Sequence, residues 1–266
     1  MNRFATAGLG LALAAAPLVA TAATATANDA TAQRASAPAY SVSAAINRTT
    51  AIAKEDVVKI RGAVSPKAAG DKVVLQQRLD GKKTWSVSGT ATIKATGRFL
   101  LKDEPSTAGT RFYRVLKPAV GSVKKGVSPE LKLVVYAWEL LTTRPSGPET
   151  NMAFTTATIG TETFGASLVT EMAGANSSIE YTLGKKCLKL RATYALTDSS
   201  ATGGSGTVAL SKDGKNVFSY GLVLGQIIED HEVDISDAFR ISYFSTSTKA
   251  PDSLVAIGSP AVLCTK

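Results

Sequence analysis

Apolar and polar residues alternate over short segments along most of the chain, and turn residues separate these segments. The pattern is clearest between Ser177 and Leu224, where Gly184-Lys185 and Asp213-Gly214 interrupt it. Alternation with a period of two predicts β-strands with one buried face, and the short turns predict antiparallel pairing. The strands expected in this region are Ile179–Leu183, Leu188–Tyr194, Val208–Leu210 and Val217–Tyr220.

Residues 40–136 carry the same pattern and show no helical periodicity. Turn residues such as Asp80-Gly81 and Thr96-Gly97 divide them into seven expected strands, which are Tyr40–Ile46, Val57–Gly62, Val73–Leu79, Thr84–Ile93, Arg98–Lys102, Phe112–Lys117 and Leu131–Tyr136. Seven short strands in a segment of this length resemble an immunoglobulin-like or fibronectin-III-like β-sandwich. We expect Trp85 and Tyr113 to fill the space between its two sheets.

A second β-sandwich is expected over residues 137–266. Its further strands are Ile227–Ile235, Ala238–Phe244 and Ala261–Cys264. Charge also separates the two segments, because residues 40–136 hold 18 Lys and Arg against 7 Asp and Glu, whereas residues 137–266 hold 10 against 13. A basic segment followed by a mildly acidic one indicates two units. The predicted fold class is therefore all-β, with two β-sandwich domains.

The N-terminus has the pattern of a secretory signal peptide. Met1-Asn2-Arg3 supplies a positive charge, and an apolar run of small residues extends from Ala5 to Ala20. Small residues follow, so we expect cleavage after Ala22, with Ala27 as a second candidate. Residues 23–39 are rich in Ala and Thr and are expected to form a flexible linker. The sequence shows no other apolar run of membrane-spanning length, so a secreted protein without a membrane span is predicted.

Export determines which partners the basic first domain would meet. Outside a cell, a surface rich in Lys and Arg would encounter anionic wall polymers or acidic polysaccharides before nucleic acid. The alternative is that these cations only keep the strands solvated. No nucleic-acid partner is predicted.

The two cysteines, Cys187 and Cys264, predict one disulfide in an exported chain. It would close a loop of roughly 77 residues, which the chain-entropy model values at about 4 kcal/mol. Two free thiols are the alternative, and a zinc site is disfavoured because the cysteines lack the close spacing of zinc ligands. Alternation places Cys187 on the face of Lys189 and Arg191, so we expect the bond at a sheet edge or on the outer face.

Residues 150–246 resemble the NPCBM family of carbohydrate-binding modules. The resemblance rests on the order and spacing of eight segments, which are Ile179–Gly184, Leu188–Ala195, Asp198, Gly204–Leu210, Lys212–Lys215, Ser219–Leu224, Val233–Ser236 and Phe239–Ile241. It implies a jelly-roll sandwich related to the galactose-binding domains, with binding of a glycan and no catalysis. Two segments depart from the family pattern. Phe164–Val169 lacks the expected histidine, and Ala250–Ile257 keeps one acid and no aromatic residue.

A glycan module would need an exposed aromatic residue to stack on a sugar and loop acids to bind its hydroxyls. The candidates are Asp198, Asp252 and Trp138, the only tryptophan near this domain. The alternative is that Trp138 packs at the junction of the two domains and that both acids are turn residues.

Signals for catalysis are weak. His231 is the only histidine and stands among acids, but alternation sends Asp230, Glu232 and Asp234 to one face and His231 to the other. The Gly-rich segment 203–206 lacks the Lys-Ser/Thr of a phosphate-binding loop. We therefore predict no catalytic residue, metal or cofactor. The sequence predicts a secreted, non-catalytic protein that attaches to extracellular or cell-wall polysaccharide. The alternatives are a structural or adhesive surface protein without sugar binding and, less favoured, a hydrolase.

Overall fold

The computed structural model describes residues 38–266. The expected signal peptide, residues 1–22, and almost all of the expected linker, residues 23–39, lie outside the described residues. The described part contains nineteen β-strands, one short 3-10 helix (η1, Leu141–Thr143) and no α-helix, which confirms the all-β prediction. It holds no helix long and apolar enough to cross a membrane.

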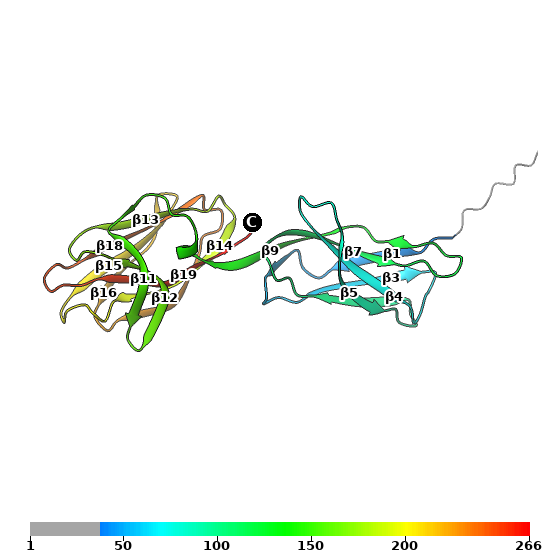
Figure 1. Cartoon of the computed structure of the whole chain (residues 1–266), viewed down its shortest axis with the longest axis horizontal. Coiled ribbons are helices and arrows are strands. Elements are labelled where there is room, and N and C mark those ends of the chain that lie inside the picture. Colours follow the sequence, from blue (N-terminus) through cyan, green and yellow to red (C-terminus); the bar gives the residue numbers. More distant parts are fainter. Residues whose placement is uncertain (1–37) are drawn as a thin grey trace, which may run out of the picture. The chain divides into compact units, whose positions relative to one another are not determined.

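The first nine strands lie between residues 41 and 140, in the N-terminal half, and form two layers (Figure 1). They are β1 (Ser41–Ile46), β2 (Thr50–Ile52), β3 (Val58–Ser65), β4 (Lys72–Leu79), β5 (Ser86–Thr92), β6 (Arg98–Asp103), β7 (Gly109–Lys117), β8 (Gly126–Val127) and β9 (Leu131–Leu140). One sheet has the order β1-β3-β6, and the other has the order β5-β4-β7-β9, with β8 on β7. Strand β2 pairs with β9 in parallel, and the remaining pairs of this half are antiparallel.

The core of this N-terminal sandwich takes apolar side chains from both sheets, among them Ile60, Phe99, Leu75 and Val115. Tyr113 is fully buried there, as expected, and its hydroxyl donates a hydrogen bond to Asp103 Oδ2. The expectation for Trp85 is wrong. The ring is only half-buried and lies on the outer face, because the guanidinium groups of Arg78 and Arg114 stack on it, 5.1 Å and 4.1 Å from the ring centroid.

The C-terminal half forms a second pair of sheets from ten further strands. They are β10 (Glu149–Thr150), β11 (Met152–Ile159), β12 (Glu162–Thr170), β13 (Ser177–Thr182), β14 (Cys187–Leu196), β15 (Ser205–Lys212), β16 (Lys215–Val223), β17 (Ile227–Asp234), β18 (Arg240–Ser247) and β19 (Val255–Cys264). One sheet has the order β10-β13-β18-β15-β16. The other runs from β11 and β12 through β19 and β14 to β17.

The main core of this C-terminal sandwich lies between the two sheets and includes Tyr181, Leu210, Tyr194 and Ile257. A second, smaller apolar cluster lies on the opposite face of β14 and β19. It contains Ala157, Ile159, Val169, Ala195 and Ala256. The hairpin of β11 and β12 therefore covers the part of that face where alanines leave room for it.

Strand β9 continues past the expected domain boundary between residues 136 and 137. Its residues Leu131 to Val135 pair with β7, and Ala137 to Leu140 pair with β19. One continuous strand thus contributes hydrogen bonds to a sheet of each sandwich.

The structure confirms the disulfide between Cys187 and Cys264. Its predicted location on the outer face or at a sheet edge is wrong, because both cysteines are buried and belong to the main core. The pairing of β14 with β19 shifts register between Cys187 and Lys189. This irregularity inserts an extra residue, so Cys187 points inward while Lys189 stays exposed.

Replacing both cysteines, Cys187→Ala and Cys264→Ala, should lower the free energy of unfolding of the C-terminal sandwich by up to about 4 kcal/mol, because the cross-link closes a loop of about 77 residues in the unfolded chain. Urea unfolding of the full chain, followed by circular dichroism and tryptophan fluorescence, measures the change. The N-terminal sandwich contains no cysteine and serves as the internal control. An unchanged urea midpoint for the C-terminal transition would contradict the stabilising role.

Candidate functional site

Trp138 lies on β9, opposite Leu263 of β19. Its ring is half-buried, and the guanidinium carbon of Arg191 lies 4.1 Å from the ring centroid. The ring already has a cationic partner that covers one of its faces. Arg191 in turn belongs to the first half of β14, whereas the candidate acid Asp198 follows the end of that strand. The structure therefore does not bring Trp138 together with Asp198.

Asp198 is exposed and holds the hairpin of β11 and β12 in place. The backbone N–H of Gly160, at the hairpin turn, donates a hydrogen bond to Asp198 Oδ1 at 2.8 Å, and the N–H of Asp198 donates to the carbonyl of Thr158. The hairpin turn borders a hollow of about 160 Å³ that is also lined by Phe164, Glu162, Glu229 and Asp230. No group of three or more metal-ligating side chains in the described part is arranged to hold a metal ion.

Asp252 is exposed in the loop that follows β18. Its carbonyl accepts a hydrogen bond of 2.7 Å from the N–H of Ala201, and the carbonyl of Leu254 accepts one from Thr197. These bonds join the loop of Asp252 to the loop of Asp198. The two candidate acids thus belong to neighbouring loops at one end of the sandwich, as a shared site would require.

His231 lies on the inward-facing side of β17, while its acidic neighbours Asp230 and Glu232 are exposed. Its Nε2 is 2.9 Å from the Tyr220 hydroxyl, and its ring packs edge-on against Phe218 and Tyr220. No carboxylate of the described residues is hydrogen-bonded to this imidazole. It is part of an aromatic cluster between the sheets rather than of an acid–base pair.

Two tyrosines complete this cluster and are tied to each other. The hydroxyls of Tyr194 and Tyr243 are 3.0 Å apart and buried. Burial raises the pKa of both phenols above the ordinary value, because the interior disfavours the charged phenolate. Burial likewise raises the pKa of Tyr181 in the same core.

The free energy of unfolding should therefore fall as the pH rises above about 10, since unfolded tyrosines release protons there that the folded protein still holds. Each buried tyrosine contributes up to about 1.4 kcal/mol per pH unit in this range. Urea unfolding between pH 8 and 11 measures the slope. Tyr243→Phe should lose about 1 kcal/mol at neutral pH with its hydrogen bond, yet decline less steeply above pH 10. An equal slope for variant and wild type would contradict the assignment.

One aromatic side chain that the sequence analysis did not select is exposed on the outer face of the sheet β10-β13-β18-β15-β16. Phe244 lies in β18, the middle strand of five, and is 48% exposed. Its directly paired neighbours are small: Ser178 on β13 and Ala209 on β15, with Ser219 on β16 beyond Ala209. The phenyl ring therefore projects above a low surface.

Polar groups surround the phenyl ring on the same face. Two residues away along β18, the Thr246 hydroxyl lies 2.6 Å from that of Thr207. In the other direction Ser242 Oγ donates to Glu180 Oε1 at 3.3 Å, and Arg240 Nη1 forms an ion pair of 3.1 Å with Glu180 Oε2. We call this surface, built on Phe244, Glu180, Arg240, Thr207 and Thr246, the Phe244 face.

The signal for this face was present in the sequence. Alternation in the expected strand Ala238–Phe244 places Ile241 and Tyr243 inward, and the structure buries both. The same parity places Phe244 with Arg240 and Ser242 on the polar side. A large aromatic residue at a polar position of a strand is the sequence feature that marks this face.

Comparison with known proteins adds little to this geometry. No family model and no curated protein matches the chain. Among solved structures, the carbohydrate-binding module TmCBM61 in complex with β-1,4-galactotriose aligns with 37% of this chain and 70% of its own, at 13% identity and a TM-score of 0.26. A likeness at this level carries no argument about the ligand of the present chain.

Proposed function

We propose that the chain is a secreted, non-catalytic binding protein that attaches to extracellular or cell-wall polysaccharide, and that the Phe244 face makes the contact. The observation that carries this proposal is the position of Phe244, half-exposed on the central strand of the sheet between the small residues Ser178 and Ala209. The disulfide is compatible with an extracellular location.

The physics of sugar binding supports this use of the face. The apolar C–H face of a pyranose ring stacks on an exposed aromatic ring, and its hydroxyls then need hydrogen-bonding partners at the periphery. Phe244 supplies the ring. Glu180 accepts and Arg240 donates hydrogen bonds on one side, and the hydroxyls of Thr207 and Thr246 do both on the other. The small neighbours leave room for an extended chain to lie across the strands.

The family assignments belong to the same proposal. We infer an NPCBM-like jelly roll for residues 137–266 and an immunoglobulin- or fibronectin-III-like sandwich for residues 40–136. The strand orders β1-β3-β6 and β5-β4-β7-β9 support the second assignment. Asp198 and Asp252 remain a proposed second contact, because their loops adjoin and the loop of Asp252 directly follows β18.

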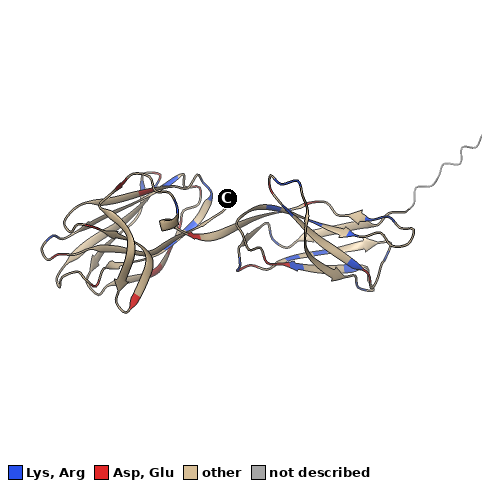
Figure 2. Ribbon diagram, viewed as in Figure 1, with Lys and Arg blue, Asp and Glu red and all other residues tan. Residues whose placement is uncertain are grey.

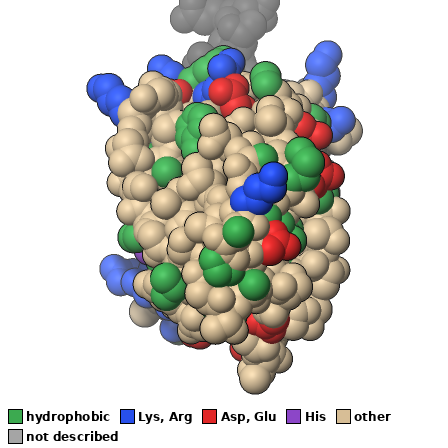
Figure 3. Space-filling model, turned by 90° about the vertical axis from the view of Figure 1, so that its left-hand side faces the viewer, with side chains coloured by type: hydrophobic (Ala, Val, Ile, Leu, Met, Phe, Trp, Pro, Cys, Tyr) green, Lys and Arg blue, Asp and Glu red, His purple; other side chains and the backbone are tan. Residues whose placement is uncertain are grey.

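A structural or adhesive protein that contacts other proteins is the second candidate function. Val217 and Val223 are exposed on β16, an edge strand of the same sheet. An exposed edge with apolar side chains can pair with another chain. The sugar proposal is favoured because Phe244 is paired with the small residues Ser178 and Ala209, whereas protein interfaces usually need a larger continuous apolar patch. Seen from the left-hand side of Figure 1, the molecule likewise shows its hydrophobic side chains in small separate patches (Figure 3).

Phe244→Ala should weaken retention on an insoluble polysaccharide by about two- to tenfold, since an aromatic stacking contact is worth about 0.5–1.5 kcal/mol. The test uses cellulose, β-1,4-galactan and a cell-wall preparation, each with and without competing soluble sugar and at 0.5 M NaCl. Binding through this face should resist the salt, because stacking and neutral hydrogen bonds are screened little.

Phe154→Ala is the matched control, because Phe154 is 43% exposed but lies on β11 in the other sheet. Asp198→Ala and Asp252→Ala locate the alternative site. If retention persists in Phe244→Ala and disappears in the aspartate variants, the binding site lies in the loops of Asp198 and Asp252 and not on the Phe244 face. Retention by none of the polysaccharides would refute the proposed function and favour the protein-contact candidate.

A further inference from the structure

A second surface, in the N-terminal sandwich, carries a different chemistry. The outward positions of the three-stranded sheet β1-β3-β6 hold Lys59 and Arg61 on β3 and Arg98 and Lys102 on β6. Lys94 precedes β6 and lines the same surface. The outward positions of these three strands include no Asp or Glu. Figure 2 shows where Lys and Arg lie along the strands of this half.

None of these five cations forms an ion pair with an Asp or Glu of the described residues. Six ion pairs occur among the described residues, including Arg48 with Asp56 and Lys117 with Asp71, and none involves a cation of this surface. Lys59 lies directly opposite Lys102 in the register. Like charges in directly paired positions destabilise a sheet. A surface can be kept solvated without placing two lysines in directly paired positions. A bound anion would reduce the repulsion between them.

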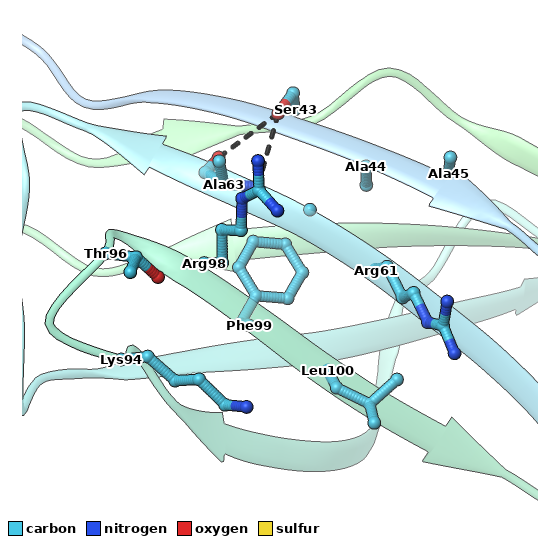
Figure 4. A pocket seen from close by; sticks show the side chains of 11 residues that line it. Ser43, Ala44, Ala45, Arg61, Ala63, Lys94, Thr96, Arg98, Phe99 and Leu100 are labelled. Atoms are coloured by element: carbon cyan, nitrogen blue, oxygen red, sulfur yellow. Dashed lines mark hydrogen bonds between the residues drawn. The ribbon is translucent and has the colours of Figure 1, made fainter.

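Three of the five cations, Arg61, Arg98 and Lys94, line a shallow groove of about 970 Å³, and Lys59 and Lys102 lie beyond it on the same sheet. Its floor is low because Ser43 and Ala63 are small, and the Ser43 hydroxyl is held against the backbone of Ala63. Figure 4 shows Arg61, Arg98 and Lys94 around this floor, with Leu100 between them. Leu100 is 39% exposed and pairs with Arg61 across the strands. The groove thus combines the hydrogen-bond donors of two guanidinium groups with the apolar side chain of Leu100.

We propose that this groove binds an extended anionic polymer of sugars or polyols whose carboxylate or phosphate groups pair with Arg61, Arg98 and the neighbouring lysines. Guanidinium groups bind carboxylate and phosphate oxygens through two parallel hydrogen bonds. Leu100 would contact the apolar C–H groups of the sugar or polyol between successive anions. The proposal deepens the attachment function, but it concerns another sheet and another ligand charge, so the two can fail independently.

The test compares two charge-reversal variants of the full-length chain. Arg61→Glu with Arg98→Glu changes the groove, and Lys83→Glu with Lys132→Glu changes the net charge equally. Lys132 belongs to β9, in the opposite sheet, and Lys83 lies in the turn between β4 and β5. Both control lysines are exposed. The probes are polygalacturonate, poly(glycerol phosphate), neutral β-1,4-galactan and a single-stranded DNA oligonucleotide.

The groove variant should bind polygalacturonate, poly(glycerol phosphate) or both at least about tenfold more weakly, while the control variant stays within about threefold of wild type. The better of the two polymers identifies whether carboxylate or phosphate is preferred. Equal losses of affinity in both variants would mean that only net charge matters, and this would overturn the proposal. No loss of affinity in either variant would also overturn it. Tighter binding of the oligonucleotide than of both polymers, dependent on Arg61 and Arg98, would replace the glycan with a nucleic acid.

A second pair of substitutions separates binding from stability. Lys59→Gln with Lys102→Gln removes the opposed like charges, so the melting temperature should stay equal or rise while affinity for the anionic polymer falls. A purely structural surface would not lose affinity. Phe244→Ala should leave binding of the anionic polymer unchanged, which keeps failure of this site distinguishable from failure of the neutral-sugar site.

Discussion

The pairing of β19 with its neighbours is the interaction on which the C-terminal sandwich depends. This strand, Val255–Cys264, bonds to β12 and β14, and its last four residues also bond to β9. The disulfide fixes its end to the start of β14. Nearly all of its residues are buried, since the core covers one face and the hairpin of β11 and β12 covers part of the other. Removing β19 would leave that sheet without its centre.

The same burial explains why the sequence showed only the end of β19. A strand covered on both faces has no alternation to detect, and Gly258, Ser259 and Pro260 break its apolar run in the middle. Only Ala261–Cys264 was predicted for that reason. Strands with one solvated face, such as β4, β6 and β18, were predicted at nearly their observed positions. Strands β11 and β12 were missed, because their alternation is irregular and β11 bulges between Thr155 and Ala157.

The alternation of positions along a strand predicts which side chains point inward as well as where the strands lie. It placed His231 inward correctly but misplaced Cys187, since one irregular residue reverses every assignment before it. Trp85 was misplaced for another reason: large aromatics usually fill a core, but here two arginines offer the ring a stable position outside. Asp198 was recognised as a loop acid, and its carboxylate is engaged by the hairpin turn of β11 and β12. Backbone partners of this kind are set by tertiary packing, which no local pattern encodes.

The two proposed surfaces differ in charge in the same way as the two halves of the sequence. The Phe244 face pairs its cation with Glu180, so its contribution to binding would come from stacking and hydrogen bonds that salt screens little. The β1-β3-β6 groove leaves its cations unpaired, so its contribution would be long-ranged and salt-dependent. Two weak sites on one protein gain effective concentration when their two ligands are held together in one matrix. A wall in which neutral and anionic chains are interwoven would then retain the protein more strongly than either surface alone.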